Sequence, residues 1–415
     1  MSSATPTPAP AARAPLKPLD TALAELLARA APLPGIESVS TFDADGRVLA
    51  QDLASSLDVP AHDNSSMDGY ALRVADWSED AVLQVNQRIP AGSSGHALAA
   101  NCAARIFTGA PIPPGADAVV MQEDCDAQDN GVRIKVQPQP GQWIRRRGED
   151  VSSGAVVLHR GERLTPASLG LAASIGFDKL QVAPRVRVAL FSTGDELVMP
   201  GEVAPADMKP GAIYNSNRFF LRALLLRLGC TVTDLGIVPD RLDATVAALK
   251  GASEQHDLIL TSGGVSVGEE DHIKPAVQAL GELALWQIAM KPGKPFAYGK
   301  IAGAHFIGLP GNPVSSFVTF LVLVRPFLLK LQGAVETAVR PTAAPAHFDW
   351  PKADKRREFL RVKRNAAGGL ELFNNQSSGV LTSAVWGDGV IDNPAGQTIA
   401  QGDVVQFIPF SALMS

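Results

Sequence analysis

Two short strings combine glycine, hydroxyl residues and carboxylates, and they are the first candidates for chemistry. Ser192–Glu196 and Ser262–Asp271 each follow an apolar run that predicts a buried strand. Small residues leave backbone N–H groups open to a phosphate, and neighbouring carboxylates can share Mg²⁺ with phosphate oxygens. Singly, a Gly-Gly turn is better explained as a tight connection, and each carboxylate as a solvated loop charge. Two such turns after adjacent strands favour a metal and phosphate site, whose candidate members are Glu196, Ser262, Gly263, Gly264, Ser266 and Asp271.

Two further elements are candidates for holding an anion. Lys291–Pro295 carries two ammonium groups on a loop stiffened by prolines, with exposed surface lysines as the alternative explanation. In Gly308–Ser315, Asn312 can cap a helix whose first position is Pro313. A helix N-terminus pointing into the same cleft is an anion site, although this string alone is explained by a well-made helix start.

Three other polar loops have structural explanations. Asp63–Ala71 and Thr108–Pro111 fit Asx-turn chemistry. Arg145–Asp150 mixes charges, so an ion network between domains explains it at least as well as substrate binding. The seven histidines show no metal-ligand spacing, and no Ser-His-Asp set can be assigned. Nucleophilic catalysis therefore has no support.

The region that must position these residues, Val186–Gln332, has the pattern of a parallel α/β sheet. Continuous apolar strands that alternate with helices predict a parallel sheet covered on both faces, with ligands at the carboxyl ends of its strands. The predicted strands are Val186–Phe191, Thr231–Leu235, Leu258–Ser262 and Phe306–Leu309, and the predicted helices are Arg218–Leu228, Asp243–Lys250, Ile273–Leu280 and Pro313–Leu331. Gly229 and Gly251 stand where helix C-caps belong.

The flanking regions have a different pattern. Leu19–Ala30 predicts a short amphipathic helix, with Asp20 or Thr21 as its cap. Short β-branched runs from Asp52 to about Trp143 predict a small, mostly β module, and a strand and helix follow in Ser152–Ile175, which we expect to pack with the first helix. Beyond Gly333, strands at Phe359–Lys363 and Val404–Ile408 predict a small β-barrel or sandwich.

Composition sets the class of protein. The chain has 415 residues, 46% of them apolar and 19% charged, and the sequence shows no apolar run that we expect to span a bilayer. A net charge of −5 excludes bulk attraction to nucleic acid or anionic lipid. The three cysteines are widely separated and indicate neither a disulfide framework nor a thiolate zinc site. The start, residues 1–18, has no apolar signal segment, so we expect a flexible tail and a cytoplasmic protein.

Taken in series, seven strings resemble the bacterial MoeA family of molybdopterin molybdenumtransferases. They are Asp63–Ala71, Thr108–Pro111, Arg145–Asp150, Ser192–Glu196, Ser262–Asp271, Lys291–Pro295 and Gly308–Ser315, in that order. Each is weak alone, but together they are specific, and the resemblance runs from about Leu19 to the C-terminus.

The resemblance implies an α/β multidomain fold in an elongated subunit that forms a homodimer. It implies a mostly parallel molybdopterin-binding α/β domain at 184–332, a small β-rich domain at 53–147 and a C-terminal β-barrel at 333–415. A discontinuous dimerisation segment would comprise 19–52 and 148–183, after a tail at 1–18.

The implied reaction is a Mg²⁺-dependent insertion of molybdate into adenylylated molybdopterin, with release of AMP, in molybdenum cofactor biosynthesis. Glu196, Asp240 and Asp271 resemble the acidic residues near metal and pyrophosphate, with Glu196 and Asp271 as the metal ligands. Asp63 and Thr108 resemble residues lent by the partner subunit to a composite active site. The residues that resemble the molybdate side are Lys291, Lys294, Pro295, Ser315, Arg361 and Ser378.

Other classes of function compete with this one. An adenylyltransferase would use the same Gly-Gly and acidic cleft, but the β modules and the Lys291–Pro295 loop favour the insertion step. A molybdopterin adenylyltransferase is then the expected upstream partner. A non-enzymatic scaffold is the second alternative, and the intact acidic residues argue against it.

Overall fold

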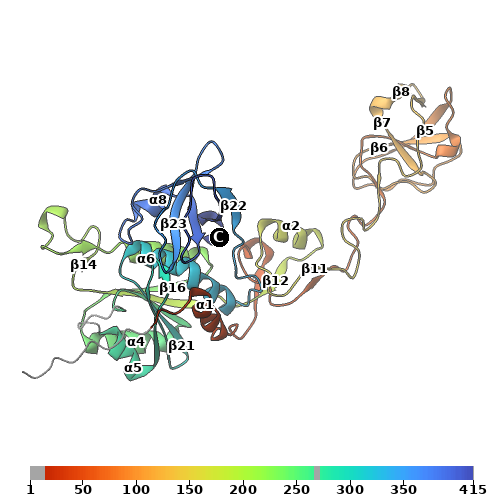
Figure 1. Ribbon diagram of the computed structural model, residues 1–415. Coiled ribbons are helices and arrows are strands. Elements are labelled where there is room, and N and C mark those ends of the chain that lie inside the picture. The colour runs from red at the N-terminus through yellow and green to blue at the C-terminus, as the bar shows by residue number, and fades with distance from the viewer. Residues whose placement is uncertain (1–14, 266–271, 415) are drawn as a thin grey trace, which may run out of the picture. The chain divides into compact units, whose positions relative to one another are not determined.

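The computed structural model describes residues 15–265 and 272–414, which form two compact units. The first unit holds the described residues up to Glu37, Gly46–Val48 and Ala183 onward, and the second holds Ser38–Asp45 and Leu49–Val182. Figure 1 shows the chain of both units, whose positions relative to one another are not determined.

A six-stranded sheet organises the first unit, in the order β16-β13-β17-β21-β20-β18. The strands are β13 (Arg187–Thr193), β16 (Thr231–Val238), β17 (Leu258–Ser262), β18 (Gly281–Gln287), β20 (Pro295–Ile301) and β21 (Ala304–Leu309). The four predicted strands are confirmed, and they pair in parallel. The edge was not predicted. Strand β18 pairs antiparallel with β20, and β20 pairs antiparallel with β21, to which a tight turn joins it.

Helices cover both faces of this sheet, as expected from its apolar strands (Figure 1). Along β13, Val188 and Leu190 belong to one core cluster, and Ala189 and Phe191 belong to the other. This alternation follows from the two-residue period of a strand. The first cluster includes residues of α3 (Asn217–Arg227), α6 (Pro313–Thr319) and α7 (Arg325–Leu331), and the second includes residues of α4 (Leu242–Gln255) and α5 (Ile273–Leu280).

The expectation that the chain has no apolar run able to span a bilayer is corrected by the helix Pro313–Leu331. It joins α6, a π-helical turn (Phe320–Val324) and α7 into 19 residues, and it is long and apolar enough to cross a membrane by length and composition. Of its most apolar window, 89% is buried inside the protein. Burial on this scale is that of a core helix, since the same side chains fill the centre of the first cluster.

Two local expectations at helix ends were wrong, the cap of the first helix and Gly251 as a C-cap. Helix α1 (Leu19–Ala28) begins after Pro18 without a side-chain cap, and Asp20 instead accepts a hydrogen bond from Arg357 Nη1 at 2.7 Å. Gly251 lies inside α4, whereas Gly229 follows α3 with φ +78° as a C-cap glycine should.

The packing of α1 also differs from expectation. Its buried residues join the cluster that contains α7, and not the core of the 152–175 segment. That segment has its own core with the residues from Val39 to Leu53, because β1 (Glu37–Ser40) pairs with β12 (Lys179–Val182) and β2 (Leu53–Ala54) pairs with β11 (Val156–Leu158). Helix α2 (Pro166–Ser174) packs on this core behind a capping box at Thr165.

The C-terminal part of the first unit is a second sheet, in the order β19-β23-β25-β26-β22, with β24 paired to β23. Its strands are β19 (Met290–Lys291), β22 (Thr342–Pro345), β23 (Arg357–Arg364), β24 (Leu370–Leu372), β25 (Gly389–Asn393) and β26 (Val404–Pro409). The two predicted strands are β23 and β26. Short helices α8 (Thr382–Trp386) and α9 (Phe410–Leu413) accompany them.

The second unit contains the predicted β module as a six-stranded sheet, in the order β7-β4-β6-β5-β9-β8. Its strands are β4 (Gly69–Leu72), β5 (Val82–Ile89), β6 (Cys102–Ile106), β7 (Ala118–Met121), β8 (Cys125–Gln128) and β9 (Gly131–Ile134), and a short pair, β3 (Asn64–Ser65) with β10 (Ile144–Arg145), lies beside them in the chain. Brief 3-10 turns occupy Thr41–Asp43, Val74–Asp76 and Gln122–Asp124. The mixed α/β, multidomain fold class is thereby confirmed.

A half-buried histidine makes the stability of the first unit depend on pH. His305 Nδ1 lies 2.8 Å from the Tyr298 hydroxyl, and burial lowers the pKa of His305 from 6.5 to about 4. Between these two values the unfolded chain binds a proton that the folded chain excludes, so stability falls as the pH drops from about 6.5 towards 4. We expect His305→Gln to weaken this pH dependence, measured by urea unfolding at about pH 7 and about pH 5. If the free energy of unfolding fell equally between these two pH values in wild type and variant, the assignment to His305 would be contradicted.

Candidate active site

A cleft of about 560 Å³ opens at the carboxyl edge of the parallel strands. Residues that follow β13, β17 and β21 line it together with the start of α3 and the start of α6. Its polar lining residues are Thr193, Glu196, Tyr214, Asn215, Ser216, Asn217, Ser262, Asn312 and Ser315, with Gly263, Pro295, Gly311 and Gly379 among the others. The edge of the sheet where ligands were predicted is therefore hollowed.

Glu196 stands at the mouth of this cleft. Gly194 has φ +140°, and a Cβ there would lie 2.5 Å from Glu196 Oε2. The missing side chain thus gives room for the exposed carboxylate to fold back over the turn. A backbone hydrogen bond from Ile213 N to Glu196 O, 2.8 Å long, ties the turn to a short pair of strands, β14 (Leu197–Val198) and β15 (Ile213–Tyr214).

The Gly-Gly turn after β17 forms the floor. Gly263 has φ +96° and Gly264 φ +66°, and Gly263 N donates to Leu309 O at 3.0 Å. A Cβ on Gly264 would meet Ile273 Cγ1 at 2.6 Å. Both positions need glycine, so the turn keeps an open backbone beside Ser262. Ser266 and Asp271, predicted for the same string, lie outside the described residues.

Two asparagines that the sequence analysis missed organise the wall. Asn217, only 8% exposed, donates its Nδ2 both to Ser262 Oγ and to Gly311 O, each at 2.7 Å. It therefore joins the turns after β17 and β21. Asn215 is 2% exposed, and its Oδ1 accepts from Arg218 N at 3.3 Å, which fixes the amide orientation. Its Nδ2 has no hydrogen-bond partner, so a buried donor at the cleft lacks an acceptor.

The start of α6 supplies a third wall. Pro313 is the first helical residue, as predicted, but Asn312 makes no side-chain capping bond, which corrects that expectation. Instead, Val314 N donates to Ser378 O at 2.9 Å. The backbone of Ser378 thus takes the place of a cap, and Ser315 lies 5% exposed in the cleft wall.

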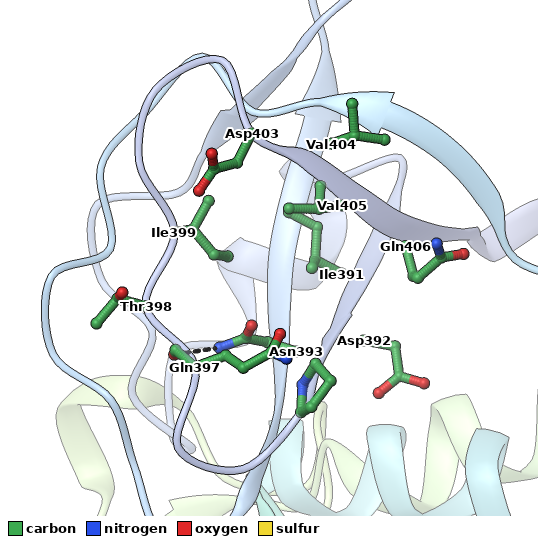
Figure 2. A pocket seen from close by; sticks show the side chains of 11 residues that line it. Ile391, Asp392, Asn393, Gln397, Thr398, Ile399, Asp403, Val404, Val405 and Gln406 are labelled. Carbon is green, nitrogen blue, oxygen red and sulfur yellow. Dashed lines mark hydrogen bonds between the residues drawn. The ribbon is translucent and has the colours of Figure 1, made fainter.

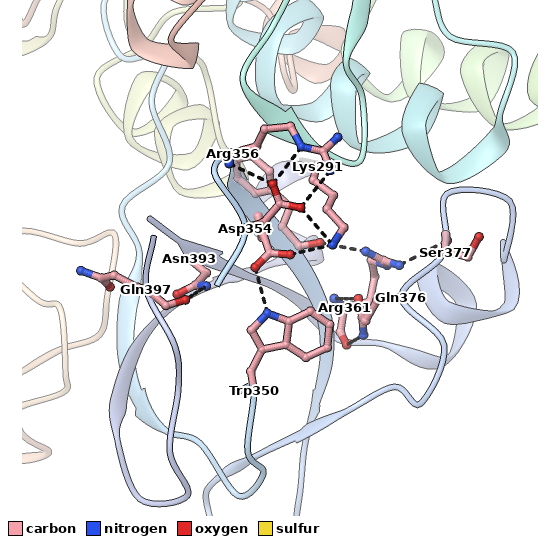
Figure 3. Close-up of polar contacts among 11 residues, drawn as sticks. Lys291, Trp350, Asp354, Arg356, Arg361, Gln376, Ser377, Asn393 and Gln397 are labelled. Atoms are coloured by element: carbon pink, nitrogen blue, oxygen red, sulfur yellow. Dashed lines mark hydrogen bonds and ion pairs between the residues drawn. The ribbon is translucent and has the colours of Figure 1, made fainter. Parts of the chain in front are cut away.

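Lys291 lies in a charge network at the junction of the two sheets (Figure 3). Its ammonium group contacts Glu358 Oε1 at 3.0 Å and Asp354 Oδ2 at 3.4 Å. Arg356 forms a bidentate pair with Asp354, and this pair holds the pKa of Asp354 well below its ordinary value. Trp350 Nε1 donates to Glu358 Oε2 at 2.8 Å. Lys291 is thus already balanced by carboxylates.

Arg361 is a buried cation with neutral partners. It is 1% exposed, and its guanidinium donates to Ser383 Oγ at 3.1 Å, Phe359 O at 2.9 Å and Ser377 O at 3.4 Å. Among the described residues, none of its hydrogen-bond partners is a carboxylate. Burial lowers its pKa to about 10, so it stays charged at neutral pH. A buried positive charge without a counter-ion is suited to an anion.

Asp63 and Thr108 lie in the second unit, each held by local bonds. Asp63 accepts from Arg147 N at 2.8 Å and from Arg146 Nη1 at 2.6 Å, and these bonds lower its pKa. Both the N–H and the hydroxyl of Thr108 donate to Asp68 Oδ1 at 2.8 Å. Asp68 is thus a supporting residue that the sequence string contained but the analysis did not single out.

The cleft gathers several predicted residues and leaves others apart. Glu196, Ser262, Gly263, Pro295 and Ser315 line it, and Gly264 adjoins it. Asp240 follows β16, the neighbour of β13, at the same edge of the sheet. Lys291 lies in the charge network with Asp354 and Glu358, and Arg361 is buried in β23. Ser378 O contacts the start of α6, and Lys294 precedes cleft-lining Pro295. The polar run from Tyr214 to Asn217, directly before a helix, was the signal for the missed residues.

A smaller cavity of about 320 Å³ lies at the loops that follow β25 and precede β26 (Figure 2). Three of its polar side chains are already engaged: Asn393 Nδ2 donates to Gln397 O, Asp392 pairs with Arg357, and Asp403 accepts from Ala400 N. No predicted site residue lines it. The large cleft is thus the better candidate.

Comparison with known proteins decides the family. Residues 17–176 match the MoeA N-terminal region (domain I and II), residues 189–330 a probable molybdopterin binding domain, and residues 343–410 the MoeA C-terminal region (domain IV). A Haemophilus influenzae protein named molybdopterin molybdenumtransferase is 41% identical over 387 residues, covering 91% of this chain and 95% of that protein. The chain belongs to the MoeA family.

Other members of the MoeA family agree. A Synechococcus elongatus protein of the same name is 37% identical over 395 residues, covering 92% of this chain and 96% of that protein. The crystal structure of the molybdopterin biosynthesis MoeA protein from Pyrococcus horikoshii OT3 superimposes with a TM-score of 0.82 at 29% identity, covering 95% of this chain and 99% of that one. The resemblance predicted from the seven strings is confirmed.

Asn217 gives a direct test of the wall. Asn217→Asp replaces a donor by a carboxylate that faces Gly311 O, and we expect it to cost about 1–3 kcal/mol of unfolding free energy. Urea unfolding measures this loss, and Gln278→Glu, the same chemical change at an exposed position of α5, is the matched control. Equal stability of both variants would show that the bridge does not hold the two turns.

Proposed function

We propose that this protein inserts molybdate into adenylylated molybdopterin and releases AMP in a Mg²⁺-dependent reaction. The coarser statement rests on family membership: the protein is an enzyme of molybdenum cofactor biosynthesis, a transferase of the molybdopterin molybdenumtransferase type. The finer statement, with its substrates and metal, rests on the cleft and on the charges beside it.

The observation that carries the proposal is a pair of neighbouring anion-binding features with different chemistry. One is the cleft, where the hydroxyls of Ser262 and Ser315 and the unpartnered Nδ2 of Asn215 can donate hydrogen bonds to a phosphate. The other is the buried, unbalanced charge of Arg361, three residues from Glu358 in β23 and bonded to the loop before cleft-lining Gly379. A phosphate monoester and a compact oxometalate need these two environments.

The residues at the strand ends fit Mg²⁺. Among residues 15–265 and 272–414, no group of three His, Cys, Asp or Glu side chains forms a metal cage. Mg²⁺ does not need one, since it commonly uses one or two carboxylates with substrate phosphates and water. Glu196 and Asp240, after neighbouring strands, are donors of this type. When bound, the metal would polarise the phosphoanhydride and reduce charge repulsion.

The protein's own groups then have distinct tasks. Asn215 would donate its unpaired Nδ2 hydrogen to an oxygen of the substrate, because no acceptor in the protein satisfies it. Ser262 is held in place by Asn217, and Ser315 presents a hydroxyl from the start of α6. Lys294 and Arg361 would compensate the charge of molybdate. The residues that line the cleft would orient the two reactants.

Glu196→Gln tests the acidic side. The change removes a charge that faces the metal and phosphate without altering volume, so we expect AMP release to fall by ~10² to 10⁴. The assay follows AMP from adenylylated molybdopterin with molybdate and Mg²⁺. Glu202→Gln, on the exposed segment after β14, is the control and should stay active. Full activity of Glu196→Gln at saturating Mg²⁺ would remove this residue from the site.

The same assay separates the alternatives. An adenylyltransferase would consume ATP and molybdopterin and would not release AMP in response to molybdate. A scaffold would do neither. We also propose that a molybdopterin adenylyltransferase is the upstream partner and that the protein is cytoplasmic. The family resemblance supports both.

A homodimer with a composite active site completes the proposal, and the resemblance of the Asp63 and Thr108 strings supports it. Asp63→Ala and Asp271→Asn proteins should each be inactive. After subunit exchange their mixture should regain ~25% of wild-type activity, because half of the dimers are mixed and each holds one intact site. Native mass spectrometry verifies the exchange. A mixture that stays inactive after complete exchange would rule out sharing between subunits.

A further inference from the structure

Glu358 is a buried carboxylate that belongs to none of the seven strings. It lies in β23 with 1% of its surface exposed. Its Oε1 accepts from Lys291 Nζ at 3.0 Å, and its Oε2 accepts from Trp350 Nε1 at 2.8 Å. Both oxygens are therefore engaged, as a buried charge requires.

Backbone pairing fixes the position of Lys291 relative to Glu358. The two residues are register partners in the parallel pair of β19 and β23, and Arg357 N donates to Ala289 O at 3.0 Å. Strand β19 comes from the chain segment that builds the α/β sheet, yet it pairs with the C-terminal sheet. The start of the Lys291–Pro295 loop is thus attached to β23 by backbone and side chain together.

The rest of the loop, from Pro292 to Pro295, is held by local contacts on its way to the cleft. Lys294 O accepts from Ile288 N at 2.8 Å, which closes the loop on itself, and Pro295 lines the cleft. In the middle, Gly293 has φ +113°, and a Cβ there would lie 2.3 Å from Thr319 Oγ1 of α6. A displacement of Lys291 would therefore move Lys294 and Pro295.

The two lysines of the loop differ in charge compensation. The ammonium group of Lys291 faces two carboxylates, Glu358 and Asp354. For the Lys294 ammonium group, the described part of the chain offers no hydrogen-bond or ion-pair partner. The cation that the loop leaves available for an anion is thus Lys294, and Lys291 serves as its anchor.

We propose that Glu358 is a positioning residue for the oxyanion side of the active site. By holding Lys291 against β23, it fixes the loop that carries Lys294 beside the cleft. This inference rests on the proposed function, since it takes the loop to bind molybdate.

Glu358→Gln tests it, because glutamine has one acceptor oxygen where Glu358 uses two. Calorimetric titration of the full-length protein with sodium molybdate alone measures the affinity. AMP release at varied molybdate separates the half-saturating concentration from kcat. We expect about tenfold weaker molybdate binding, a similar rise in half-saturation and a nearly unchanged kcat. Lys294→Ala should lose more, while binding of the pterin adenylate should stay unchanged in both.

Asp392→Asn is the matched control. Asp392 pairs with Arg357 in the same sheet, whereas the carboxylates that contact Lys291 are Asp354 and Glu358, so the loss of Asp392 perturbs the sheet and leaves both Lys291 contacts in place. Wild-type molybdate affinity in Glu358→Gln would overturn the proposal. An equal loss in both variants, matched by equal falls in Tm, would also overturn it, by showing a purely structural role.

Failure of the proposed function is distinguishable. If wild type binds molybdate and Glu358→Gln binds it weakly, Glu358 positions an oxyanion site even if no AMP is released, and only the reaction is wrong. If wild type releases AMP but shows no molybdate binding, the loop is not the oxyanion site and the inference about Glu358 falls.

Discussion

The parallel register of β13 and β17 is the constraint on which the site depends. Val188–Ser192 pairs with Leu258–Ser262, so the two strands end together and their following turns emerge side by side. Neither turn alone would indicate a binding site, because one is a small acidic loop and the other is a glycine turn. Pairing the strands one residue differently would turn the alternate side chains of β13 to the opposite faces of the sheet and break both core clusters. The burial of the sheet thus fixes the geometry of the cleft.

The sequence predicted the parts of this fold that repeat with a simple period. Strands β13, β16, β17 and β21 and helices α3 to α7 were found because apolar runs and helical spacing are local signals. The antiparallel edge of β18 and β20 was missed because its partners are set by tertiary pairing. Asp20 and Gly251 were misassigned for a similar reason: the first finds Arg357 far along the chain, and packing continues α4 through the glycine.

For the site, motif strings found the glycine and hydroxyl residues but not the residues that support them. Asn217, Asp68 and Glu358 act through contacts with positions between 40 and 94 residues away. No pattern in one sequence reports such distances. The buried charges show the same limit, because only the structure reveals that Lys291 is balanced by carboxylates while the partners of Arg361, among the residues that the structure describes, are neutral.

The pairing of β19 with β23 also bears on how this chain can be divided. A gene fragment cut near Gly333, where the helical pattern stops, would keep β19 and lose β23, the strand with which it pairs. The excised piece would then expose an unpaired strand edge, and Lys291 would lose its carboxylates, while Phe359, Val390, Ile408 and Phe410 would leave gaps in the larger core cluster. The C-terminal sheet is therefore not an appendage that recombination could exchange freely. Any exchange that preserved folding would have to carry the two-residue strand and its partner together.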